Sequence, residues 1–210
     1  MEGLKFIQYS INILEVESNV AIFDMEFTGL RKNTTPISLG IVSEDGKKFY
    51  TEFTDYDENQ CDEWIKKNVI ENLRLAGMGV GVSDTDQTPP IRIAMGDRKY
   101  IHQELREWLQ QFDTIQFVSD VCHYDFVLLI DLLTNGGTAI DLPDNISAVC
   151  HDLNMDIARH FHVSDREAFD MSREQIMNDL CGSEDIVTGD KHNSLYDAEV
   201  IRAIYKEIVR

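Results

Sequence analysis

Short apolar runs near the N-terminus predict the first strands of a sheet. Residues 20–24 form a continuous apolar run that ends on a carboxylate, which is typical of a strand buried on both faces. Residues 36–42 and 48–53 predict two further strands, and residues 43–46 between them contain the Asp-Gly pair that favours a hairpin turn. These patterns therefore predict an antiparallel meander of three strands.

The stretch from residue 57 to residue 97 carries weaker signals. Residues 61–75 show mixed helical spacing of apolar side chains, at Trp64, Val69 and Leu73. Three glycines and a Pro-Pro pair follow, and they indicate a loop. The whole stretch is interpreted as an insertion or as a flap beside a cleft, with the insertion slightly favoured.

Helical and strand patterns alternate in the second half of the chain. The predicted helices are residues 100–112, 126–133, 153–161 and 194–209, and the predicted strands are residues 114–118 and 148–150. A meander followed by alternating strands and helices predicts an α/β fold, a mixed sheet flanked by helices on both faces. We expect residues 1–210 to form a single domain, with residues 1–19 as an N-terminal extension.

The chain carries a large excess of negative charge. The 19 Lys and Arg residues face 38 Asp and Glu residues, which gives a formal net charge of −19. Such a surface repels nucleic acid and anionic membranes as a whole, so unspecific wrapping of nucleic acid is excluded. An acidic protein can still act on phosphates where bound divalent cations reverse the local field.

Targeting signals and cysteines favour a reduced, cytoplasmic protein. No apolar stretch approaches the ~18 residues of a membrane span, and the N-terminus lacks the apolar region of a signal peptide. Cys61, Cys122, Cys150 and Cys181 occur singly, and we expect four reduced thiols. The two Cys-His dipeptides offer zinc ligands, but paired ligands of this kind lack the usual spacing.

The first candidate for chemistry is the pair Asp24 and Glu26. Side chains two apart on a strand point to the same face, so both carboxylates should project together. Two like charges at that distance raise each other's pKa unless a cation shares them, and such oxygen ligands suit Mg²⁺ or Mn²⁺. An isolated Asp-x-Glu is more often a solvated strand end. The apolar residues 20–23 favour the buried, functional interpretation.

Asp125 is a second candidate, at the start of a predicted helix. It follows the strand at residues 114–118, and a carboxylate there is also explained by the helix dipole alone. Asp120 and Asp131 compete with it, and spacing alone does not exclude Asp120.

His192 and Asp197 form the third candidate. Ser194 and Asp197 have the spacing of a capping box that would open the last helix, which is a sufficient explanation for Asp197 by itself. His192 should then lie in the preceding loop and be free to point into a cleft. Lys191 beside it is either a phosphate contact or, more commonly, a solvated lysine.

Together the three elements resemble a known family. The run Asp24-Met-Glu-Phe-Thr-Gly-Leu30, the pair Tyr124-Asp125 and the spacing His192-x4-Asp197 are similar to the ordered motifs of DEDDh 3′→5′ exonucleases. These RNase H-like enzymes include oligoribonucleases, proofreading subunits and small bacterial and phage exoribonucleases. The resemblance spans about residues 20–205. Two features depart from it: residues 119–121 read Ser-Asp-Val where many members have Gly-His-Asn, and residues 57–97 match no family pattern.

The resemblance implies a two-metal exonuclease. Two Mg²⁺ or Mn²⁺ ions about 3.5–4 Å apart would be held by four acids and would activate a water and stabilise the transition state. The implied metal ligands are Asp24, Glu26, Asp125 and Asp197. His192, with an unperturbed pKa near ~6.5, would be the general base. The substrate would be the 3′ end of single-stranded nucleic acid, with RNA favoured, and the products nucleoside 5′-monophosphates.

By similarity, Phe27, Thr28 and Leu30 would hold the terminal nucleotide, although core packing explains Phe27 and Leu30 equally well. A single-stranded DNA exonuclease, a metal-dependent phosphatase or endonuclease, and a catalytically silent nucleic-acid-binding module are the alternatives. Retention of all five family residues argues against the silent module. The sequence leaves a homodimer open and predicts no membrane partner.

Overall fold

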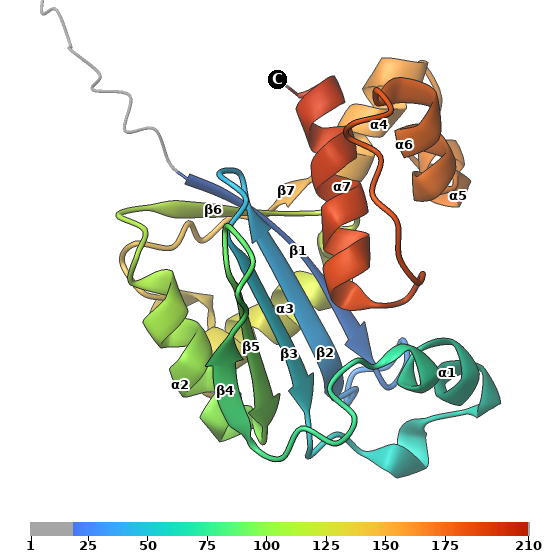
Figure 1. Ribbon diagram of the computed structural model, residues 1–210. Helices are drawn as coiled ribbons and strands as arrows, with labels where there is room; N and C mark the ends of the chain where they lie inside the picture. Colours follow the sequence, from blue (N-terminus) through green and yellow to red (C-terminus); the bar gives the residue numbers. More distant parts are fainter. Residues whose placement is uncertain (1–18, 210) are drawn as a thin grey trace, which may run out of the picture.

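The protein folds around a seven-stranded mixed sheet with helices on both faces, as predicted (Figure 1). The computed structural model describes residues 19–209, so the expected N-terminal extension lies outside the described residues except for Asn19, which begins β1. The strands lie in the order β4–β5–β3–β2–β1–β6–β7. Their bounds are β1 Asn19–Phe27, β2 Pro36–Ser43, β3 Lys48–Phe53, β4 Gly81–Asp84, β5 Ile91–Gly96, β6 Ile115–Ser119 and β7 His151–Asp152.

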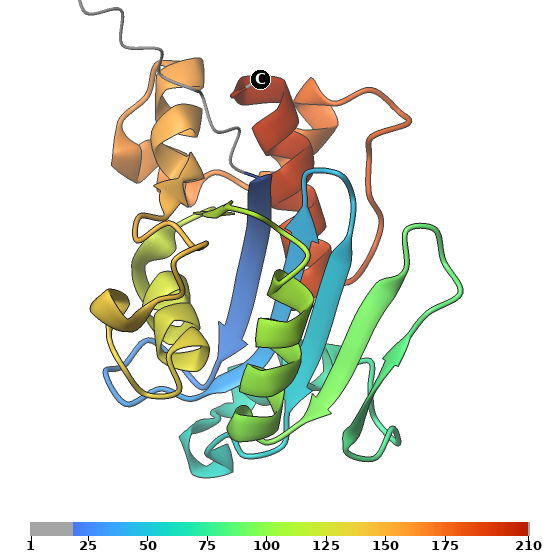
Figure 2. The same cartoon turned by 90° about the vertical axis from the view of Figure 1, so that its left-hand side faces the viewer.

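The helices divide between the two faces of the sheet (Figures 1 and 2). Helices α2 and α3 cover one face, and α4, α6 and α7 cover the other. The bounds of the helices are α1 Glu63–Asn68, α2 Arg98–Leu109, α3 Cys122–Leu133, α4 Leu153–Phe161, α5 Asp165–Asp170, α6 Arg173–Leu180 and α7 Ser194–Ile208. Among the described residues, no helix combines the length and the apolar character needed to cross a membrane.

Strand β1 sends alternate side chains to the two faces of the sheet. Phe23 and Met25 pack in the core formed with α2 and α3, whereas Ile22 packs in the core formed with α4 and α7. Asp24 and Glu26 follow Ile22 at intervals of two residues and therefore lie on the α7 face. The apolar residues of β1 thus fix two carboxylates on the same face at the end of the strand.

One edge of β1 is paired along only part of its length. On one side, β2 pairs antiparallel with β1 as far as Phe27. On the other side, β6 pairs in parallel only from Asn19 to Ile22. Beyond Ile22 the chain of β6 turns into α3, so the second half of this edge faces the start of α3.

Helix α7 packs closely on β2. A Cβ atom at Gly40 of β2 would overlap the backbone of Ser194 and Leu195, the first two residues of α7. Only glycine therefore allows this approach. The close contact sets the position of the N-terminus of α7 above the sheet.

The loop predicted from the glycines and prolines in the second half of residues 57–97 was wrong, because this part contains two strands. Strand β5 pairs in parallel with β3, and β4 pairs antiparallel with β5, so residues 81–96 complete one side of the sheet. Glycines and prolines around these strands concealed them, and β4 is too polar and exposed to show an apolar pattern. The first half contains α1, which lies beside the end of β1.

Other elements also differ from the predictions. Helix α3 begins at Cys122, four residues earlier than expected, and β7 is His151–Asp152 rather than residues 148–150. Helices α5 and α6 were not predicted. Both are short, and each begins at a serine whose hydroxyl caps it, Ser164 and Ser172.

Candidate active site

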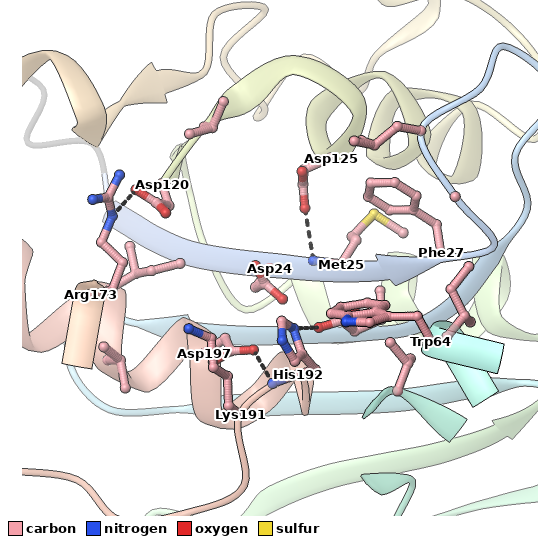
Figure 3. A pocket seen from close by; sticks show the side chains of 18 of the residues that line it. Asp24, Met25, Phe27, Trp64, Asp120, Asp125, Arg173, Lys191, His192 and Asp197 are labelled. Carbon is pink, nitrogen blue, oxygen red and sulfur yellow. Dashed lines mark hydrogen bonds and ion pairs between the residues drawn. The ribbon is translucent and has the colours of Figure 1, made fainter. Parts of the chain in front are cut away.

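A cavity of about 650 Å³ opens at the end of β1, between the N-terminal turns of α3 and α7 (Figure 3). The structure brings all five residues predicted for catalysis to its wall. They are Asp24, Glu26, Asp125, His192 and Asp197. We refer to the four carboxylates as the acid cluster.

Asp24 lies among the other three carboxylates of the acid cluster. Burial raises the pKa of Asp24 well above its usual value, and the carboxylates of Asp197, Asp125 and Glu26 raise it further. Within residues 19–209, its carboxylate has neither a hydrogen bond nor an ion pair. A buried, unpartnered carboxylate among like charges is the environment that a bound cation would relieve.

Asp125 is positioned by the open edge of β1. The backbone N–H of Met25 has no strand partner there, and it donates to Oδ1 of Asp125 at 2.9 Å. This bond joins the first turn of α3 to the strand that carries Asp24 and Glu26. Burial raises the pKa of Asp125 to about 7, although the Met25 hydrogen bond opposes the shift.

The two competitors of Asp125 have cationic partners. Asp120 accepts from Nε of Arg173 at 2.6 Å, and Asp131 pairs with Arg98 at 2.5 Å. The remaining N–H groups of Arg173 bind the backbone of α5 and the side chain of Asn154, so the pair joins α6 to the wall of the cavity. Asp125 is therefore the acid of this segment that faces the cluster without a counter-charge.

Asp197 and His192 hold each other in place at the start of α7. The backbone N–H of His192 donates to Oδ2 of Asp197 at 2.8 Å. His192 has a φ of +63°, a left-handed conformation that turns the chain into the helix. Burial and the nearby Glu26 raise the pKa of Asp197 to about 7.

The His192 ring lies beside Glu26. Nδ1 of His192 is 3.6 Å from Oε1 of Glu26, and this interaction raises the pKa of His192 above its usual value. One possible ligand atom from each of Glu26, His192 and Asp197 lies within 4.8 Å of the others. The donor set, carboxylate oxygens with an imidazole, is one that divalent cations accept.

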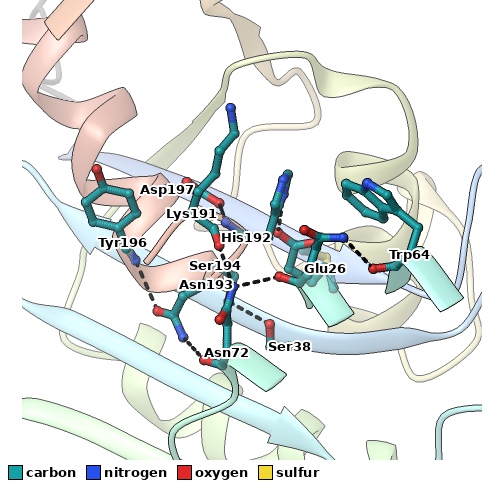
Figure 4. A network of polar contacts seen from close by, with 12 residues as sticks. Glu26, Ser38, Trp64, Asn72, Lys191, His192, Asn193, Ser194, Tyr196 and Asp197 are labelled. Atoms are coloured by element: carbon teal, nitrogen blue, oxygen red, sulfur yellow. Dashed lines mark hydrogen bonds and ion pairs between the residues drawn. The ribbon is translucent and has the colours of Figure 1, made fainter. Parts of the chain in front are cut away.

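The predicted capping box at Ser194 and Asp197 is wrong. Asn193 is the N-cap of α7, and its Oδ1 accepts from the backbone N–H of Tyr196 at 3.3 Å. Ser194 instead donates to Ser38 of β2 at 2.9 Å (Figure 4). Because Asp197 is not used in capping, its carboxylate is available to the cluster.

A buried polar network supports the His192 loop from below (Figure 4). Asn193 donates through Nδ2 to the hydroxyl of Tyr50 at 3.0 Å and to the carbonyl of Asn72 at 3.2 Å. Asn72 in turn donates to the carbonyl of Lys191 at 2.7 Å. Tyr50 donates to the buried Glu52 at 2.6 Å, so the network is anchored in the core of the sheet.

Trp64 is a site residue that the sequence analysis missed. Its ring lies edge-on to that of His192, with centroids 4.9 Å apart, and the side chain is 54% exposed. In the sequence, Trp64 is only one apolar position of a mixed helical pattern with Val69 and Leu73. The three-dimensional path of residues 57–72, which turns α1 toward β1, is what brings it to the rim of the cavity.

The three residues expected to hold the nucleotide have different environments. Phe27 lines the cavity and stacks on Tyr124, with centroids 5.7 Å apart, and Leu30 at the rim is 78% exposed. Thr28 is fully buried and does not line the cavity. Its hydroxyl donates to Gln60 at 2.6 Å and accepts from the N–H of Thr35. Thr28 therefore stabilises the turn that presents Leu30.

Comparisons with known proteins bear on this geometry. No family model matches the chain. It is 28% identical over 112 residues to 3′-5′ exoribonucleases of two Mycobacterium tuberculosis strains, CDC 1551 / Oshkosh and H37Rv. The match covers 52% of this chain and 58% of each relative, so the chain spans less than two thirds of the curated relatives it matches.

Two solved structures share the fold. A full-length 3′-exonuclease aligns over 91% of this chain and 81% of its own, with a TM-score of 0.60 and 10% identity. A 3′-exonuclease solved in 3′-end-specific recognition of a histone mRNA stem-loop aligns over 89% of this chain and 62% of its own, with a TM-score of 0.56 and 12% identity. The chain thus shares the α/β fold of these two structures. Its sequence similarity over 112 residues is to 3′-5′ exoribonucleases.

Proposed function

We propose that this protein is a metal-dependent 3′→5′ exonuclease that hydrolyses single-stranded nucleic acid to nucleoside 5′-monophosphates, with RNA as the favoured substrate. The observation that carries the proposal is the convergence of the acid cluster and His192 at the end of β1. The names of the curated relatives and the shared fold support it.

The acid cluster fits divalent cations. Asp24, Glu26, Asp125 and Asp197 would hold two Mg²⁺ or Mn²⁺ ions, since these ions prefer oxygen ligands. When bound, the ions would lower the pKa of a water and neutralise charge that develops on the phosphate. Asp24 has no protein partner among the described residues, which is why we assign it to the centre of the ligand set.

His192 would accept the proton of the attacking water. Its Nδ1 faces Glu26, so Nε2 is the nitrogen left for this role. The hydrogen bond from the His192 N–H to Asp197 and the hydrogen bonds of Asn193 fix the His192 loop, and so keep the ring beside the acid cluster. The Trp64 ring covers one side of the imidazole and restricts its rotation.

The rim of the cavity supports binding of a chain terminus. Leu30 is an exposed apolar side chain next to the acid cluster and suits a wedge against the last base. Arg31 and Lys191 also line the cavity, and they supply the positive charge that phosphates require at an otherwise acidic surface.

A polarity assay tests the proposal. Single-stranded RNA and DNA, labelled at the 5′ end, are incubated with Mg²⁺ or Mn²⁺ and resolved on a gel, with free or phosphorylated 3′ ends. We expect RNA to shorten stepwise from a free 3′ end and a 3′ phosphate to slow this step. Faster shortening of DNA would favour the DNA exonuclease, and internal cuts in a circular strand at a comparable rate would indicate an endonuclease.

Two further predictions concern the location of the protein in the cell and its oligomeric state. We infer a cytoplasmic location, because all four cysteines are free and a reducing compartment keeps them so. A homodimer remains a prediction, which light scattering of the purified protein measures directly.

A further inference from the structure

Two thiols outside the proposed chemistry lie together beside the cavity. Sγ of Cys122 is 2.9 Å from Sγ of Cys150, and both side chains are half-buried. A disulfide bond is ~2.05 Å long, so the sulfurs need to approach by less than about 1 Å to form one. Cys61 is buried elsewhere, and Cys181 lies in the apolar cluster around α6 and α7.

The fold explains why these two cysteines meet. Strands β6 and β7 pair in parallel at Val118–His151 and Ser119–Asp152, so the chain before β7 runs beside the end of β6. After β6 the chain turns into α3, whose first residue is Cys122. Cys150 directly precedes β7. The Cys122 thiol also approaches the carbonyl of His151, at 3.3 Å.

We propose that Cys122 and Cys150 are a redox-active pair that closes to a disulfide and anchors the first turn of α3. That turn carries Asp125, three residues after Cys122, and is also joined to the sheet by the Met25 bond and by the Cys122 N–H, which donates to Oδ2 of Asp152 at 3.4 Å. Cys150 lies in the irregular segment between residues 142 and 150, which can move more easily than a helix. The approach of the sulfurs is therefore taken up by Cys150, and Asp125 keeps its position.

The chemistry balances with a peroxide as the oxidant. The Cys122 thiolate attacks one peroxide oxygen, the O–O bond breaks, and a sulfenic acid and water form. The Cys150 thiol then attacks the sulfenic sulfur, the S–O bond breaks, and a second water leaves. Cys122 is assigned as the attacking group and Cys150 as the resolving thiol, because the contact with Cys122 and burial raise the pKa of Cys150.

The test uses the full chain, first reduced and then treated with hydrogen peroxide at about one equivalent. We expect the number of titratable thiols in denaturant to fall from four to two, and mass spectrometry to find residues 122 and 150 linked. Closure of this loop should raise the melting temperature on the order of 5–10 °C. Amide exchange in residues 119–126 should slow, while nuclease activity in Mg²⁺ stays within about twofold.

Three variants make the result specific. C122S and C150S should each lose the oxidant-dependent rise in melting temperature, while C181S, a half-buried thiol elsewhere, should keep it. Each variant is compared with its own reduced form, so a general loss of stability does not affect the comparison. Four titratable thiols after oxidation, a link between other cysteines, or an unchanged melting temperature would overturn the proposal. The thiol count, the identity of the linked residues and the melting temperature do not depend on the nuclease assignment.

Discussion

Three carboxylates of the acid cluster have raised pKa values because the fold buries them together. Burial is the main cause for Asp24, Asp125 and Asp197, and mutual repulsion adds to it. A raised pKa means that the folded state binds the proton more tightly than the unfolded state. The stability that these three carboxyl groups contribute is therefore fully present below their usual pKa near 4, and it is lost as pH rises through about 7. The cluster destabilises the metal-free protein at neutral pH.

Removing one charge should relieve this cost. In the metal-free protein at pH 8, Asp24→Asn should raise the melting temperature by several degrees, and the difference should shrink toward pH 5 as the wild-type carboxylates take up protons. The same variant should lose at least ~10²-fold in activity. Calorimetric scans at both pH values measure the first effect, with the exposed Asp113→Asn as the matched control. A lower melting temperature for Asp24→Asn at pH 8 would contradict the assigned electrostatics.

His192 should report cation binding through its own titration. In metal-free protein its pKa should lie above 6.5, because Glu26 stabilises the imidazolium. Bound Mg²⁺ should lower the pKa, since cations neutralise the carboxylates that face the ring. NMR titration of labelled histidine, with and without Mg²⁺, measures both values, and His192→Ala assigns the signal. A pKa that Mg²⁺ leaves unchanged would separate His192 from the metal site.

Single residues were predictable where a short motif carried them. The Asp-x-Glu spacing follows from strand geometry alone, so Asp24 and Glu26 could be placed together without a structure. Trp64 could not, because it reaches His192 through the path of α1 across the end of the sheet. Thr28 sits within the recognisable motif, yet its hydroxyl is used by Gln60, 32 residues away. A motif identifies residue types but not the partners that long-range packing supplies.

Elements were predictable where the signal was local. The strand at 48–53 and the helix at 153–161 have the predicted bounds, because hairpin chemistry and helical spacing are complete within each segment. Strands β4 and β5 were missed because neighbouring strands, and not a local pattern, stabilise them: β5 pairs with β3, and β4 pairs with β5. Asn193 and Ser194 are neighbouring candidates for the N-cap of α7. Ser194 does not cap the helix because its hydroxyl donates to Ser38 of β2, which a local pattern cannot show.

The contact between α7 and β2 gives a prediction about how these two elements pack. Gly40→Ala should displace the N-terminus of α7, and with it His192 and Asp197, because the new methyl group meets backbone that has no rotamer to change. We expect a loss of about 1–3 kcal/mol in the free energy of unfolding, with activity reduced at least tenfold in the protein that remains folded. Denaturant unfolding and turnover measure the two effects.

Gly182→Ala is the matched control, because nothing lies within 4 Å of the Cβ it would add and Gly182 has no positive φ. Equal stability and activity of both variants would show that α7 does not rest on β2 as described.

At the scale of the whole molecule, the charge of −19 limits how nucleic acid can bind. Few cations face the cavity, and the remaining surface repels phosphates, so binding should depend on a short terminal segment. The plot of log affinity against log salt should then have a slope between about −1 and −2. Fluorescence anisotropy with the Asp24→Asn variant and labelled single-stranded RNA measures it. A slope steeper than about −4 would indicate an extended basic surface that the described residues do not provide.

The most direct test of the proposed metal-dependent exonuclease activity is whether product formation requires a divalent cation. Unlabelled single-stranded RNA with a free 3′ end is incubated with the wild type in Mg²⁺, in Ca²⁺ or in excess EDTA, and the products are separated by liquid chromatography. We expect nucleoside 5′-monophosphates in Mg²⁺, no turnover in EDTA or Ca²⁺, and recovery of activity when Mg²⁺ or Mn²⁺ is restored. Undiminished release of products in EDTA, or products other than nucleoside 5′-monophosphates, would contradict it.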